Sequence, residues 1–127
     1  MTFKLSKRSL SNLEGVHPDL VKVIKRAIAI TEIDFTVIEG LRSVNMQKQL
    51  VASGASQTMR SRHLTGHAVD LAAIVDGAIS WDFKYYEKIA DAVLKAGAEL
   101  NVPIVWGGLW KTLVDGPHFE LHKGKYP

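Results

Sequence analysis

Histidines and carboxylates gather in two stretches of the sequence. In SRHLTGHAVD, His63 precedes Asp70 by seven residues, and Asp70 is an acid inside an otherwise apolar run. In DGPHFELH, Asp115 precedes His118 by three residues. A buried carboxylate is costly unless it is paired or binds a metal. Two histidines, one carboxylate and a second carboxylate nearby are the components of a catalytic zinc site, in which three protein ligands leave one position for water.

The first stretch can bring its two polar side chains together. Gly66 permits a sharp change of direction between His63 and Asp70, and the β-branched run after it favours a strand over a helix. Taken alone, however, Asp70 is more often a paired or edge-strand acid than a ligand, and a lone histidine is usually structural or on the surface.

The second stretch reads as a turn followed by a strand. On that strand His118, Glu120 and His122 share one face. Asp115 in an Asp-Gly-Pro turn is commonly only a turn residue, but its spacing to His118 favours a role as general base. Glu120 is the rival base, with contact to a ligand or to substrate as its alternative role. His122 is expected on the surface.

Hydrophobic spacing and turn residues predict the elements that position these side chains. In order, they are a helix in HPDLVKVIKRAIAITEI with Pro18 in its first turn, a strand at 35–39, a helix at 43–53 that stops at Gly54, an irregular polar segment at 55–67, a strand at 68–75, a hairpin turn at Asp76-Gly77, a long helix capped by Asp82, and strands at 103–106 and 117–122. This order predicts an α+β fold, with a small, mainly antiparallel sheet flanked by about three helices in one domain over residues 1–127.

Composition limits the chemistry and the location. The absence of cysteine excludes disulfides and Cys-ligated zinc, so a metal must bind to His, Asp or Glu. The formal charge of +3 suits an anionic polymer such as nucleic acid or cell-wall glycan-peptide, although a solvated basic surface is the commoner meaning. The N-terminus lacks the apolar core of a signal peptide, and no run approaches the roughly 20 apolar residues of a membrane span. We therefore expect synthesis in a cytoplasm without an export signal.

Three motifs resemble one protein family. SRHLTGHAVD matches the SxHxxGxAxD pattern of the M15 zinc peptidases, which include D-Ala-D-Ala carboxypeptidases, dipeptidases and phage L-alanyl-D-glutamate endopeptidases. DGPHFEL is similar to the family's second motif, and IEGLRS, residues 38–43, to the segment that carries its arginine. The motifs occur in the family's order, and the short chain looks most like the phage endolysin branch. The resemblance implies a fold of the Hedgehog/DD-peptidase type and a single catalytic domain without a separate wall-binding domain.

The resemblance also implies roles for individual residues. His63, Asp70 and His118 become the zinc ligands, and Asp115 becomes the general base that takes a proton from a water activated by zinc. Arg42 becomes the residue that steadies the polarised carbonyl or a substrate carboxylate, with a surface ion pair as its alternative. His67 occupies a variable position of the motif and receives no metal role.

Four further residues are candidate substrate contacts. Ser61 stands first in the first motif and contacts substrate or orients a ligand. Gln47 lies on a predicted helix near Arg42, with solvent exposure as the alternative. Trp106, one of two tryptophans that flank a glycine pair, forms a wall of the cleft or packs in the core. Glu120 is the fourth candidate substrate contact.

The function that follows from the resemblance is zinc-dependent hydrolysis of the L-Ala–D-Glu bond in the peptide stems of bacterial peptidoglycan. The expected protein is a monomer that binds neither nucleic acid nor membrane and reaches the wall through a pore made by a separate, holin-like protein. One alternative is a D-Ala-D-Ala carboxypeptidase or dipeptidase on the same zinc site. The alternative from another class is a non-catalytic wall- or nucleic-acid-binding module with a structural metal.

Overall fold

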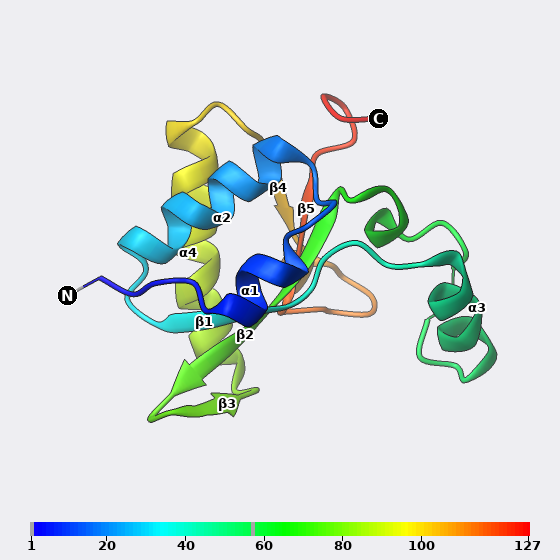
Figure 1. Ribbon diagram of the computed structural model, residues 1–127, viewed down its shortest axis with the longest axis horizontal. Coiled ribbons are helices and arrows are strands. Elements are labelled where there is room, and N and C mark those ends of the chain that lie inside the picture. The colour runs from blue at the N-terminus through cyan, green and yellow to red at the C-terminus, as the bar shows by residue number, and fades with distance from the viewer. Residues whose placement is uncertain (1, 57) are drawn as a thin grey trace.

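An antiparallel sheet of five strands organises the chain (Figure 1), as seen in a computed structural model that describes residues 2–56 and 58–127. The strands are β1 (Asp34–Glu39), β2 (Ala68–Val75), β3 (Ala78–Ser80), β4 (Ile104–Trp106) and β5 (His118–Leu121). Their order in the sheet is β1-β2-β5-β4, and β3 pairs with the end of β2. The α-helices are α1 (Lys7–Asn12), α2 (Pro18–Ile30), α3 (Val44–Ala52) and α4 (Phe83–Glu99), and two 3-10 helices are η1 (Arg62–Thr65) and η2 (Gly107–Leu109).

The predicted α+β class and the antiparallel sheet are confirmed. Local signals placed several elements correctly: Ser43 caps α3, Asp82 caps α4 and Pro18 opens α2. The hairpin at Asp76-Gly77 has positive φ at both residues, as a two-residue hairpin turn of this sequence requires. The prediction missed α1, a short polar helix that packs against β1.

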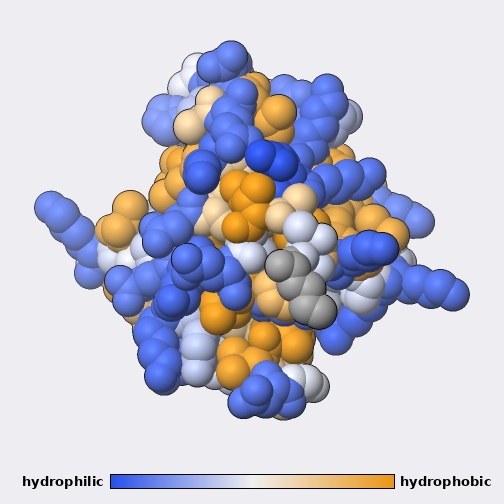
Figure 2. All heavy atoms as spheres, turned by 90° about the vertical axis from the view of Figure 1, so that its left-hand side faces the viewer, coloured by the Kyte–Doolittle hydropathy of each residue, from blue (hydrophilic) through white to orange (hydrophobic). Residues whose placement is uncertain are grey.

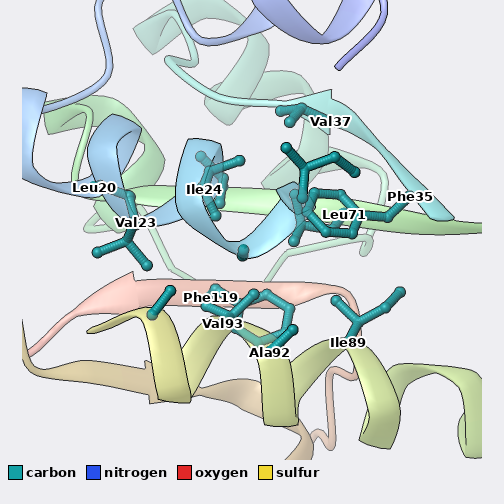
Figure 3. Close-up of a cluster of buried hydrophobic side chains, with 14 of the residues drawn as sticks. Leu20, Val23, Ile24, Phe35, Val37, Leu71, Ile89, Ala92, Val93 and Phe119 are labelled. Atoms are coloured by element: carbon teal, nitrogen blue, oxygen red, sulfur yellow. The ribbon is translucent and has the colours of Figure 1, made fainter. Parts of the chain in front are cut away.

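The hydrophobic core lies on one face of the sheet, under α2 and α4 (Figure 3). Leu20, Val23 and Ile24 of α2 meet strand residues such as Leu71 and Phe119 there, and all five are buried. Because side chains alternate along a strand, the residues between these strand positions point to the other face. The site described below is built on that second face of β2 and β5.

The side of the molecule that carries the N-terminus and α2 is mostly hydrophilic, with only separate hydrophobic patches (Figure 2). This agrees with amphipathic helices whose apolar sides face the core. In the described part of the chain, no helix combines the length and the apolar character that crossing a membrane requires.

Candidate metal centre and active-site cleft

The sheet brings Asp70 and His118 together. They are directly opposite each other in the antiparallel register of β2 and β5. Their side chains point to the face away from the core, and His118 Nδ1 lies 3.2 Å from Asp70 Oδ1. Two segments separated by 48 positions in sequence thus supply one histidine and one carboxylate to a single point.

The third member, His63, comes from η1. Ser61 caps this short helix by accepting a hydrogen bond from the His63 N–H, and Gly66 ends it in the left-handed conformation with φ of 75°. The chain therefore turns at the predicted glycine and enters β2. His63 Nε2 lies 3.3 Å from the same Asp70 oxygen, so the predicted convergence across Gly66 is confirmed.

His63, Asp70 and His118 form a group that could hold a metal ion, because one ligand atom from each lies within 4.8 Å of the others. In each histidine ring, the nitrogen that faces away from Asp70 already forms a hydrogen bond. His63 Nδ1 donates to the Gly40 carbonyl at 2.9 Å, and His118 Nε2 donates to Glu120 Oε1 at 2.9 Å. These bonds fix each ring so that the remaining nitrogen faces Asp70, an arrangement typical of histidine metal ligands. The donor set suits zinc.

Hydrogen bonds within this centre shift the pKa values of Asp70 and His118 in opposite directions. Burial acts to raise the pKa of Asp70, but hydrogen bonds from His118 and His63 outweigh it and hold that pKa well below its usual range. Burial acts to lower the pKa of His118, but hydrogen bonds to Asp70 and Glu120 outweigh it and raise the pKa to about 9. The centre thus concentrates negative charge around the histidine rings, which is the environment that a cation needs.

Asp115 is held beside this centre by a turn. Its carbonyl accepts the N–H of His118 at 3.2 Å, and its own N–H donates to the Gly107 carbonyl at 3.0 Å. A Cβ at Gly107 would lie 2.5 Å from the Asp115 carbonyl oxygen, so this approach requires glycine. Burial and the charge of Asp70 raise the pKa of Asp115. A carboxylate with a raised pKa, beside a metal centre and lining the same cavity, can accept a proton.

Glu120, the rival base, has a different position. Its side chain is buried and receives the hydrogen bond from His118 Nε2, while its second oxygen lies 3.7 Å from Arg62 Nε. Burial acts to raise the pKa of Glu120, but the bond from His118 outweighs it and lowers the pKa. Glu120 therefore contacts the side of the His118 ring that faces away from Asp70, which favours an orienting role.

Arg42 lies on the loop side of the cleft, and its neighbours accept hydrogen bonds from four of the five N–H groups of its guanidinium. Glu39 accepts from two of its nitrogens, with 2.7 Å between Nη2 and Oε2. Nη1 donates to Gln47 Oε1 at 2.7 Å and to Ser61 Oγ at 3.4 Å. The Arg42 main-chain N–H donates to the His63 carbonyl, which links this arginine to a metal-ligand segment.

Gln47 is fully buried, which excludes the alternative of solvent exposure. Its amide oxygen accepts from Arg42, and its amide nitrogen donates to Ser56 Oγ at 2.9 Å and to the Thr58 carbonyl. Gln47 does not line the cavity, and it connects Arg42 to the loop after α3. Helical periodicity could not reveal this, because the loop that covers Gln47 comes later in the chain.

Trp106 packs in the core, which decides between the two alternatives for this residue. Its ring stacks near Phe83 and Phe119, and its Nε1 donates to the Gly116 carbonyl at 2.7 Å. The other tryptophan, Trp110, lines the cavity instead, with its ring centroid 5.1 Å from that of His118. Trp106 and Trp110 lie directly before and after η2. Their different environments follow from the way this turn folds.

A cavity of about 570 Å³ runs past the metal centre. Its lining includes residues of the metal group, the predicted Arg42, Ser61, Asp115 and Glu120, and residues that were not predicted: Glu39, Leu50, Gly54, Ala55, Ser56, Thr58, Arg60, Arg62, Trp110, Leu113 and Lys123. Of these, Glu39 had a sequence signal, since an acid three residues before Arg42 can form an ion pair with it. The cleft is large enough for several residues of a peptide.

A model of the phage L-alanyl-D-glutamate peptidase family matches residues 1–122. The chain belongs to this family. The L-alanyl-D-glutamate peptidase of Escherichia phage T5 is 35% identical over 130 residues, covering 99% of this chain and 94% of the relative. That of Listeria phage A118 is 31% identical over 129 residues, and the match covers 99% of this chain but only 45% of the longer relative.

A solved structure is also similar to this chain. The crystal structure of the L-Ala D-Glu endopeptidase ChiX from Serratia marcescens matches with a TM-score of 0.94 and 52% identity, covering 99% of this chain and 95% of that one. The predicted resemblance to the endopeptidase branch of the M15 peptidases is therefore confirmed. Each of these three matches covers 99% of this chain.

Proposed function

We propose that this chain hydrolyses the L-Ala–D-Glu bond in the peptide stems of bacterial peptidoglycan, with zinc held by His63, Asp70 and His118. The observation that carries the proposal is the arrangement of this triad beside Asp115 in one cleft, in a chain of the L-alanyl-D-glutamate peptidase family. The three ligands come from η1, β2 and β5, and each histidine is oriented by an acceptor on its other nitrogen.

Zinc bound by three protein ligands supplies Lewis acidity and lowers the pKa of a water molecule to about 7. The residues of the chain perform the remaining tasks. Asp115 accepts the proton of the attacking water and passes it to the amine of the leaving D-Glu. The Asp115 turn suits this role, because hydrogen bonds to Gly107 and His118 hold it against the metal centre.

Arg42 stabilises the negative charge that develops on the carbonyl oxygen of the scissile bond. Its guanidinium is held by Glu39 and Gln47, so little reorganisation is needed during the reaction. Ser61 caps η1, faces Arg42 and lines the cavity, and we retain it as a substrate contact. Gln47 acts through Arg42, and Glu120 acts through His118.

The biological role that we infer is lysis of a bacterial host late in phage infection. In this proposal a monomer is made in the host cytoplasm, acts on peptidoglycan and reaches the wall through a pore formed by a separate protein. The phage relatives named as L-alanyl-D-glutamate peptidases support this context.

The test is an analysis of the products released from purified peptidoglycan, with and without a chelator. The proposal predicts new amino-terminal D-Glu, suppressed by the chelator and restored by added zinc. Free D-Ala as the product would instead indicate a D-Ala-D-Ala carboxypeptidase or dipeptidase. Zinc binding without any cleavage would indicate a non-catalytic module.

A further inference from the structure

The lining of the cavity that contains the metal centre also includes two exposed cations, Arg60 and Lys123. Both side chains are exposed to solvent. In residues 2–56 and 58–127, neither forms an ion pair with a carboxylate. We call this pair of residues the cationic wall.

The other cations of the cavity are already matched by carboxylates. Arg42 is paired with Glu39, and Arg62 lies 3.7 Å from Glu120. The cationic wall therefore supplies positive charge to the cleft that no side chain of the described residues neutralises. An anionic group on the substrate is the natural partner for such a wall.

The main chain around both cations is tied to the site. The Arg60 N–H donates to Thr58 Oγ1 at 2.9 Å, and the Thr58 carbonyl accepts from buried Gln47. Lys123 follows β5 in a turn that Arg62 holds by donating to the carbonyls of Leu121 and Tyr126.

We propose that Arg60 and Lys123 bind a free carboxylate of the peptide stem, and that the enzyme therefore prefers stems with unmodified acidic groups to stems in which these groups are amidated. The inference rests on the proposed function, because it takes a wall peptide as the substrate. Apart from the carboxylate at the C-terminal end, two carboxylates of the stem have this chemistry. In a stem where D-Glu is joined onward through its side-chain carboxyl, its α-carboxylate stays free beside the scissile bond. A diaminopimelate at the third position carries a second one.

The test compares synthetic stem peptides of four kinds, all with an amidated C-terminus. They are an L-Ala–γ-D-Glu–diaminopimelate peptide, the same peptide amidated at the D-Glu α-carboxylate, the same peptide with lysine as third residue, and one that lacks both free carboxylates. The variant is Arg60→Gln/Lys123→Gln. The matched control is Lys22→Gln/Lys25→Gln, which removes two exposed cations from α2, an element well separated from α3 and its loop in Figure 1.

For the unmodified peptide, the variant should raise KM about tenfold and leave kcat unchanged, because solvent-exposed charge contacts add binding of that order. Its KM should also depend less on salt. The peptide that lacks both carboxylates should be cleaved equally by the variant and the native chain. If the variant and the native chain cleave one of the two singly modified peptides with the same KM, the carboxylate missing from that peptide is the one that Arg60 and Lys123 bind. The charge-preserving variant Arg60→Lys/Lys123→Arg should restore KM, and the α2 control should match the native chain.

An unchanged KM in the variant, or an equal rise for the peptide without carboxylates, would overturn the inference while leaving the proposed function intact. Failure of the native chain to cleave any of the four peptides would overturn the proposed function as well.

Discussion

The two sides of the candidate site are built in different ways. On the sheet side, Asp70, His118 and Glu120 are positioned by the pairing of β2 with β5. On the loop side, Arg42 and Ser61 are positioned by side-chain hydrogen bonds among residues 39–61. The sheet side depends on backbone register, and the loop side depends on a polar network.

This difference predicts different sensitivities. A strand cannot move by one residue without turning its buried side chains outward, so the sheet side is rigid and suits metal ligands. A buried polar network loses its order when one member loses its partner, so the loop side is sensitive at residues that touch no substrate. We therefore expect sheet-side changes to affect zinc and loop-side changes to affect turnover at constant zinc content.

The largest effect is expected for Asp70→Ala on the sheet side. Asp70 is the only carboxylate that both histidine rings face in the described residues, so its loss should abolish zinc retention and wall lysis together. Metal content after dialysis and the clearing of a wall suspension measure the two effects. Asp91→Ala on the exposed side of α4 is the control and should change neither. Full zinc retention in Asp70→Ala would mean that the metal binds elsewhere.

Asp115→Asn is expected to separate chemistry from metal binding. The amide keeps the size of the side chain but cannot take a proton, so kcat should fall by about 10²–10⁴-fold while one zinc per chain is retained. Stopped-time product analysis and metal content measure these quantities. Native activity in this variant would remove Asp115 as the base, whereas loss of zinc would make it a ligand.

Glu120→Gln should weaken the metal centre rather than remove it. The amide of this variant offers no charged acceptor to His118 Nε2, and loss of such an orienting partner typically lowers metal affinity by about 10–100-fold. A zinc titration against a competing chelator measures the affinity, with Glu87→Gln on α4 as the control. If kcat falls while zinc affinity stays native, Glu120 and not Asp115 is the better candidate for the base.

The smallest effect on catalysis is expected for Gln47→Leu on the loop side. It leaves Arg42 and the Thr58 carbonyl without a buried partner, which should cost about 1–3 kcal/mol of stability. Catalysis should fall less than the roughly 10²–10³-fold cost of losing a direct oxyanion stabiliser, because Glu39 still holds Arg42. Thermal unfolding, kcat/KM and zinc content report the three effects. Gln49→Leu, at an exposed position of the same helix, is the control. Lowered zinc content in Gln47→Leu would refute the separation of the two sides.

The features that could be predicted from sequence are mainly those that depend on neighbouring residues. Asp76-Gly77, Gly66 and the Asp82 cap obey rules that involve only neighbouring residues, and the structure confirms all three. The grouping of His63, Asp70 and His118 came from a family motif, since their meeting depends on the register of β2 and β5.

The missed features all depend on distant parts of the chain. Helix α1 has no apolar period, and it is fixed by contacts such as the hydrogen bond between buried Ser9 and Thr36. Gln47 looked exposed because its partners lie in a later loop. Trp106 and Trp110 have similar neighbours in sequence, but one enters the core and the other lines the cleft.

The most direct test of the account is a crystal structure of the zinc-loaded protein, with anomalous scattering recorded on both sides of the zinc absorption edge. The account predicts one zinc peak per chain, at about 2.0–2.2 Å from His63 Nε2, His118 Nδ1 and an Asp70 carboxylate oxygen. A peak bound by other residues, or the absence of a peak between these three side chains in protein that cleaves peptidoglycan, would contradict it.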